Sequence, residues 1–173
     1  MNILEIADRA DELILTHDTR NPLTILEELN ITLVFQYLES VKGCFLVHNR
    51  NDYTIINDRL EECEAVWVIA HEIAHKILHY STARNLSNGL LKYTVYDVNV
   101  RSKQEYEANV FAAELLIADD ILLDYIYNYG YTLEQCAKLL SMHPAIIALK
   151  VEILIARGYD IRGQDYDKNF LIH

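Results

Sequence analysis

The feature that most constrains this chain is the pentapeptide HEIAH at residues 71–75, which lies inside a long, otherwise apolar stretch. The spacing of the apolar residues in that stretch predicts one helix over residues 59–80. Residues four positions apart share a helix face, so His71 and His75 point in the same direction. Polar groups that face a core cost free energy unless something binds them. The pattern therefore favours a metal site over two histidines that merely hydrogen-bond within the core.

Two imidazoles one helical turn apart can both reach a single zinc ion at the usual Zn–N distance of about 2.0–2.1 Å. Glu72 lies one residue round the helix, where its carboxylate could hydrogen-bond a water molecule on the metal without being a ligand. A catalytic zinc takes three protein ligands, so we expect the third from the helix predicted over 103–117. We favour Glu105 over Glu107, because its face carries small residues that permit close approach. These residues are Ala108, Asn109 and Ala112.

Other polar residues near the motif are weaker candidates for a role in metal binding or catalysis. His79 continues the four-residue spacing, but it lies about 12 Å along the helix axis from His71, too far to join the same ligand set. We interpret His79 as a helix-end histidine that the helix dipole favours. Tyr93, Tyr96 and Tyr106 are candidates for the donor that would stabilise an oxyanion beside the metal.

The elements around the HEIAH helix predict an α+β fold. Helices are expected over residues 3–15 and 22–29, and strands over 31–37, 43–48 and 53–57. We expect the strands to form a small antiparallel sheet, a meander packed on the HEIAH helix. Residues 81–103 are predicted to be irregular and to border the site as a wall or lid, because they join the two ligand-bearing helices.

The second half of the chain is predicted to be helical. Helices are expected over residues 103–117, 119–129, 132–140 and 144–156. A composition shift near residue 130 divides the chain into a domain over 1–130, a helix pair over 131–157 that packs on it, and a tail over 158–173. The pair has the rhythm of a helix-turn-helix, but the only basic residue of its second helix is Lys150. We therefore expect a packing or partner-docking role, and no reading of DNA.

Charge excludes further classes of protein. The chain has 15 Lys and Arg against 26 Asp and Glu, a formal net charge of −11. Binding to nucleic acid draws its affinity from basic residues that neutralise phosphates, and anionic membranes attract basic surfaces. Both partners are therefore disfavoured. The hydrophobic fraction of 51% excludes a disordered chain.

The cysteines and the N-terminus predict a cytoplasmic protein. Cys44, Cys63 and Cys136 are odd in number and widely spaced, which is typical of reduced thiols rather than of a disulfide framework. No apolar run approaches the roughly 20 residues that span a bilayer. The acidic first 15 residues lack the basic start and apolar stretch of a signal peptide.

Two longer strings give the sequence a family resemblance. HEIAHKILH, followed by EYEANVFAAELLI, resembles the ImmA/IrrE family of zinc metallopeptidases, which shows an HExxH helix and a later ExxAN-x-FA-x-x-LL helix. The resemblance extends over most of the chain and implies a zincin-like domain. It also implies that His71, His75 and Glu105 ligate Zn²⁺ and that Glu72 is the general base.

The resemblance further implies a zinc endopeptidase that cleaves a helix-turn-helix repressor and so derepresses genes of a mobile element or a stress response. Members of the family are commonly encoded beside such repressors. Two alternatives stay open at this point. One is a non-cleaving module that sequesters a repressor or another protein, and the other is a zinc hydrolase that acts on a small molecule. The intact pair of His71 and His75 around Glu72 counts against a pure binding module, which need not keep Glu72.

Overall fold

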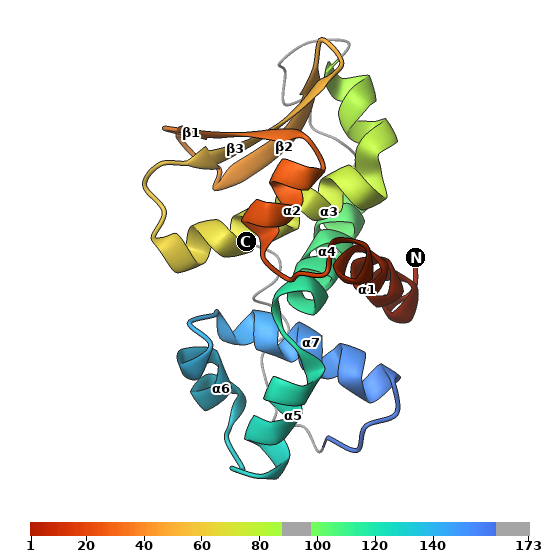
Figure 1. The fold of residues 1–173 in the computed structure, drawn as a ribbon, viewed down its shortest axis with the longest axis vertical. Coiled ribbons are helices and arrows are strands. Elements are labelled where there is room, and N and C mark those ends of the chain that lie inside the picture. The colour runs from red at the N-terminus through yellow and green to blue at the C-terminus, as the bar shows by residue number, and fades with distance from the viewer. Residues whose placement is uncertain (88–97, 162–173) are drawn as a thin grey trace.

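The computed structural model describes residues 1–87 and 98–161, which form an α+β fold (Figure 1). This confirms the fold class expected from the sequence. The elements before the HEIAH motif are α1 (Ile3–His17), α2 (Pro22–Glu28), β1 (Ile31–Gln36), β2 (Gly43–His48) and β3 (Asn51–Asn57). The later elements are α3 (Glu62–Ser87), α4 (Val98–Leu116), α5 (Asp119–Tyr127), α6 (Leu133–Leu139) and α7 (Pro144–Ala156).

The sheet is mixed, with the strand order β1-β3-β2. β2 and β3 form an antiparallel hairpin, but β1 pairs with β3 in parallel. The predicted all-antiparallel meander is therefore wrong, because β3 rather than β2 occupies the centre. β2 instead lies close against α3, where a Cβ atom on Gly43 would come within 2.6 Å of the Val68 side chain. Tertiary packing of this kind decides which strand is central, and strand periodicity does not record it.

The motif helix is longer than predicted. α3 continues to Ser87, with non-helical backbone angles at His79 (φ −125°, ψ 18°) that mark a kink. α4 begins at Val98 rather than near residue 103. Much of the segment predicted to be irregular over 81–103 is thus helical, and residues 88–97 lie outside the described residues. The lid expected there stays a prediction.

α4 runs through the middle of the molecule and packs against α1, α3 and α7. Figure 1 shows the sheet and α3 at one end, α5, α6 and α7 at the other, and α4 between them. Several consecutive residues of α4 are fully buried: Val110, Phe111, Ala112 and Ala113. A single apolar cluster joins residues of α1, α3, α4 and α7. The division of the chain at residue 130 stays a prediction, and most of the predicted tail, residues 162–173, lies outside the described residues.

The two C-terminal helices have the boundaries that their capping residues favour. The Thr132 side chain accepts a hydrogen bond from the backbone of Gln135 at the start of α6, and His143 caps α7 just before Pro144. Within the described residues, no single helix is long and apolar enough to cross a membrane. α6 and α7 meet that test only together, although they are bent by 113°, and most of α7 is buried in the core.

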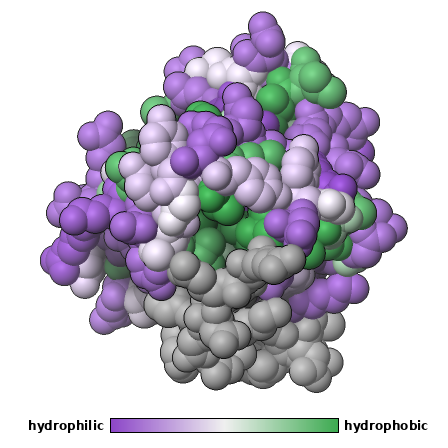
Figure 2. All heavy atoms as spheres, turned by 90° about the horizontal axis from the view of Figure 1, so that it is seen from below, coloured by the Kyte–Doolittle hydropathy of each residue, from purple (hydrophilic) through white to green (hydrophobic). Residues whose placement is uncertain are grey.

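Figure 2 looks at the molecule from below, turned by 90° from the view of Figure 1. Hydrophilic side chains surround this face, and apolar ones gather nearer its middle (Figure 2). The exposed apolar residues of the C-terminal helices and their connections include Ile121, Tyr127, Leu139 and Ile155.

Candidate metal centre

The structure brings His71, His75 and Glu105 together at the crossing of α3 and α4. The Nε2 atoms of the two histidines lie 3.1 Å apart. The Glu105 carboxylate oxygens lie 3.2 Å from Nε2 of His71 and 3.7 Å from Nε2 of His75. One ligand atom from each residue lies within 4.8 Å of the others, and the three side chains are half-buried. Three atoms that carry lone pairs converge on one point, which is how metal ligands are arranged.

α4 approaches α3 closely because its facing residues are small. Ala108 and Ala112 are fully buried in the core. Asn109, on the same face, places its Oδ1 atom 2.8 Å from Nδ1 of His71. An amide oxygen accepts hydrogen bonds, so Nδ1 of His71 carries the proton and Nε2 keeps its lone pair. A partner on the far nitrogen of a ligating histidine fixes the ring and its tautomer, a role for Asn109 that sequence reasoning missed.

His75 is held in the same way by a chain of two residues behind it. Its Nδ1 atom lies 3.1 Å from Nδ1 of His79, and Nε2 of His79 lies 2.9 Å from the Glu107 carboxylate. Since the carboxylate accepts, His79 donates to Glu107 through Nε2, and its Nδ1 accepts from His75. Nε2 of His75 is then free to face Glu105.

His79 and Glu107 therefore differ from what the sequence suggested. His79 does lie at a helix break, but its ring is buried and bonded to side chains on either side. Glu107 is 6% exposed and lies behind the histidines, while Glu105 lies in front of them. The contact of His79 with Glu107 depends on how α4 crosses α3, which the residues of α3 alone do not specify.

The pKa values of the two histidines are shifted in opposite directions. Burial, reinforced by the charge of His71, lowers the pKa of His75 to about 3. Burial would also lower the pKa of His71, but the hydrogen bond and charge of Glu105 raise it above its usual value. Of the two rings, His71 is therefore the one that holds a proton more strongly. A metal ion at this point would displace a proton from its Nε2 atom, because metal ligands must be deprotonated.

Glu72 is 5% exposed and lies beside the cluster without joining it. Burial raises its pKa to about 7, while the charge of His71 and a hydrogen bond from the backbone N–H of Phe45 act in the opposite direction. Phe45 belongs to β2, so this strand sets the orientation of the carboxylate. A carboxylate whose pKa lies near neutrality can both accept and return a proton.

Of the three tyrosines named as oxyanion donors, Tyr106 lies among the described residues. Tyr106 lies on α4, 36% exposed. Burial and the charge of Glu152 on α7 raise its pKa, so within the described residues its charged neighbour belongs to α7 rather than to the histidine cluster. Tyr93 and Tyr96 lie outside the described residues.

Comparison with known proteins defines the class to which this fold and site belong. The model of the peptidase M78 family, described as the IrrE N-terminal-like domain, matches residues 26–152. That range includes both helices of the candidate metal centre. The chain belongs to this family of metallopeptidase-like proteins, and membership implies a metal ion.

Two curated proteins show the same relationship along most of their length. An uncharacterized immunity region protein 2 of Bacillus phage phi105 is 30% identical over 139 residues, which cover 80% of this chain and 84% of that protein. The metallopeptidase ImmA of Bacillus subtilis (strain 168) is 30% identical over 136 residues, or 76% of this chain and 75% of that protein. These similarities support a peptidase, in agreement with the family resemblance of the sequence.

Proposed function

We propose that the protein is a zinc-dependent endopeptidase that cleaves a helix-turn-helix repressor, and that it uses His71, His75 and Glu105 as ligands and Glu72 as general base. The observation that carries the proposal is the convergence of two Nε2 atoms, 3.1 Å apart, with a carboxylate. Two imidazoles and one carboxylate are the ligand set of many catalytic zinc sites. When bound, zinc supplies a Lewis acid that polarises the scissile carbonyl and activates water.

The side chains around that position have separate tasks. Asn109 and His79 hold the two rings so that both Nε2 atoms face Glu105. Glu72 accepts a proton from the attacking water and later delivers it to the leaving amine, and its pKa of about 7 suits both steps. The Phe45 backbone N–H keeps the Glu72 carboxylate turned toward the site.

The repressor as substrate rests on two weaker supports. One relative is named as an immunity region protein of a phage and another as a metallopeptidase. The formal net charge of −11 is complementary to the basic surface that a DNA-binding protein needs.

The test compares the wild type with Glu72→Gln and with the control variant Glu27→Gln. The Glu72→Gln change is nearly isosteric and leaves the three ligands intact, so zinc content should be unchanged. Cleavage should fall by about 10²–10⁴-fold, the usual contribution of a general base. Glu27 is exposed on α2, and its conversion to glutamine should change neither quantity.

The substrates are helix-turn-helix repressors from the same genome and a proteome-derived peptide library, with zinc measured by elemental analysis. Cleavage of the library but not of the repressor would contradict the repressor as substrate. Binding of the repressor with no cleavage by the zinc-loaded wild type would favour the non-cleaving module instead. Cleavage by Glu72→Gln at the wild-type rate would contradict the role of Glu72.

A further inference from the structure

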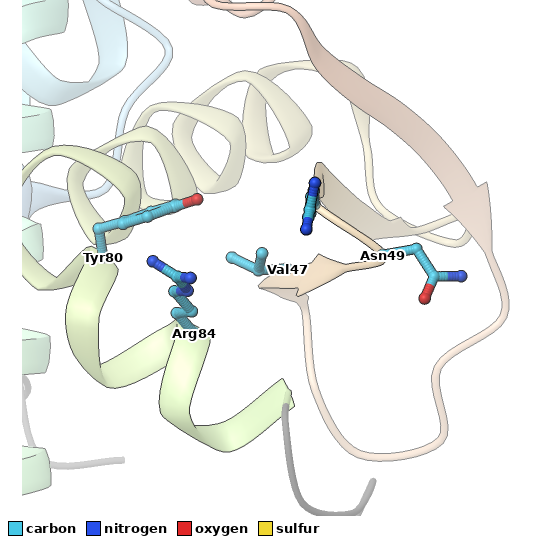
Figure 3. Close-up of a pocket in the computed structure, with 5 residues that line it drawn as sticks. Val47, Asn49, Tyr80 and Arg84 are labelled. Atoms are coloured by element: carbon cyan, nitrogen blue, oxygen red, sulfur yellow. The ribbon is translucent and has the colours of Figure 1, made fainter.

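A polar pocket of about 400 Å³ lies between the end of α3 and the tip of the β2–β3 hairpin (Figure 3). Figure 3 shows Tyr80 and Arg84 on α3 facing Val47 on the hairpin, while the side chain of Asn49 points away from them. Arg50, the next residue of the hairpin turn, also lines the pocket. These five residues are called the hairpin pocket below.

The charge of the hairpin pocket is opposite to that of the chain as a whole. Its lining contains two arginines and no carboxylate, although acidic residues outnumber basic ones by 26 to 15. The nearby carboxylate of Asp52 is already neutralised, because it pairs with Lys76 and accepts a hydrogen bond from the Tyr80 hydroxyl. Among residues 1–87 and 98–161, neither Arg50 nor Arg84 forms an ion pair. The hairpin pocket therefore presents positive charge for an anion.

The walls of the hairpin pocket are held in place before any ligand binds. The Lys76 ammonium lies 4.1 Å from the centre of the Tyr80 ring, and the Phe45 ring packs against Tyr80 with centroids 6.3 Å apart. On the other wall, Asn49 and Arg50 form the two-residue hairpin turn, and both have positive φ, 50° and 66°. Such turns favour glycine at the second position.

The positive φ of Arg50 is informative because a side chain there is costly. An L-residue in the left-handed region loses roughly 1–2 kcal/mol. Strain of this kind is found where the surrounding structure uses it, often at binding sites. Arg50 is exposed, and within the described residues it forms no ion pair that would offset this cost. A guanidinium that lines the hairpin pocket could instead bind a ligand there.

The hairpin pocket is connected to the candidate metal centre through Phe45. The backbone of Phe45 bonds Glu72, and its ring contacts Tyr80. Along α3, Tyr80 follows His75 by a rise of about 7.5 Å. Along β2, Val47 lies about 7 Å beyond Phe45. The hairpin pocket is thus about two to four residues of extended peptide from the reacting carbonyl.

β2 also offers a route along which a peptide can lie. In the described sheet it pairs with β3 on one side, and it is an edge strand on the other. Extended peptides bind edge strands through main-chain hydrogen bonds, while pockets select alternate side chains. A peptide placed along β2 would pass Glu72 at Phe45 and reach the hairpin pocket beyond Val47.

We propose that the hairpin pocket binds the carboxylate of an aspartate or glutamate side chain in the substrate, two to four residues from the scissile bond, through Arg50 and Arg84. Guanidinium and carboxylate groups match in geometry and form two parallel hydrogen bonds. This inference rests on the peptidase function proposed above.

The first measurement maps cleavage positions in a proteome-derived peptide library by mass spectrometry. We expect aspartate and glutamate to be enriched at one position on one side of the cut. Two acetylated and amidated peptides that differ only as glutamate or glutamine at that position then give the preference as a ratio of kcat/KM. A charged hydrogen-bonded pair predicts a ratio of about 10 to 100.

The variants are Arg84→Gln, Arg50→Gln and, as the matched control, Arg9→Gln on the exposed face of α1. Each hairpin-pocket variant should bring the ratio toward one, chiefly by lowering the kcat/KM for the glutamate peptide. Arg84→Glu should favour a lysine peptide over the glutamate peptide. The control should keep the wild-type ratio.

Two outcomes separate this inference from the proposal on which it rests. A wild type that cuts peptides without an acidic preference, or whose preference survives in both Arg84→Gln and Arg50→Gln, overturns the role of the hairpin pocket alone. A zinc-loaded wild type that cuts no peptide contradicts the peptidase function, and this inference with it.

Discussion

Two groups of buried charge lie along α4, and they are built differently. The candidate metal centre takes Glu105 and Asn109 from the first part of the helix. An ion-pair cluster takes Glu114 from its later part, together with Lys150 and Arg157. Both groups place ionisable side chains inside the protein, where an unpaired charge is costly.

The ion-pair cluster takes its cations from the chain itself. Lys150 and Glu114 are fully buried and lie 2.6 Å apart. Arg157 lies 2.8 Å from Asp119 and 2.6 Å from Asp11, and Lys150 also contacts Asp119. Each of the two cations contacts at least two carboxylates, so every donor has an acceptor, although the three carboxylates outnumber the cations. This cluster joins α1, α4, α5 and α7, and its cations need no ligand from outside the chain.

The candidate metal centre is left one cation short. Its two Nε2 atoms and the Glu105 carboxylate all offer lone pairs to the same point, and their outer partners already occupy the remaining nitrogens. The comparison teaches that burial of charge does not by itself mark a functional site, whereas convergence of acceptors does.

The largest effect expected is the loss of metal from His75→Ala. This variant removes one of the three proposed ligands, so the zinc content should fall from one ion per chain to near none. Elemental analysis of the purified protein measures it. The control is His48→Ala, which removes an exposed imidazole at the end of β2 and should leave zinc content unchanged. Equal zinc content in His75→Ala and the wild type would contradict the assignment of His75 as a ligand.

The next largest effect is a loss of folding stability when the ion-pair cluster, but not the metal centre, is disrupted. Lys150→Met leaves the buried Glu114 with only Arg157, 3.2 Å away, as a cationic partner, and breaking a buried ion pair in this way costs about 3–5 kcal/mol. We expect a lower free energy of unfolding in urea, with zinc still bound by the folded protein. Lys138→Met on the exposed face of α6 is the control and should change stability by less than about 0.5 kcal/mol. Loss of zinc from folded Lys150→Met would show that the two clusters are coupled.

The sequence predicted what depends on local spacing. The HEIAH helix, its facing histidines and the small residues that let α4 approach all follow from the helical repeat, and the α+β class follows from the order of elements. The place of Lys150 was not predicted, because its partner Glu114 lies 36 residues away. A lysine in the middle of an apolar helix was the available signal, since lysine is almost never fully buried unless it is paired.

The central place of β3 and the partners of His79 were missed for a related reason. Strand order depends on which strand packs against α3, and the His79 contact depends on a kink and on a second helix. Neither is a property of one segment. Most helices and strands could be predicted from the sequence. Contacts between them could be predicted only where small residues or polar groups on one face indicated a close approach.

The smallest effect expected concerns His79, which touches the candidate centre without being a ligand. His79→Phe keeps an aromatic ring in the kink but removes the acceptor for Nδ1 of His75 and the donor to Glu107. Loss of such an outer partner typically weakens metal affinity by 10- to 100-fold. Competition with a chelator measures the dissociation constant for zinc, and the unfolding of the metal-free protein is measured in parallel.

The second variant, Glu107→Gln, separates orientation from packing. Glutamine keeps an acceptor for His79 but removes the charge that favours the donated proton, so its effect on zinc affinity should be smaller than that of His79→Phe. A purely structural role would lower the stability of the metal-free protein and leave zinc affinity unchanged in both variants. Weaker zinc binding at unchanged stability would instead place His79 and Glu107 with the metal centre, and not with self-satisfied charges such as those around Lys150.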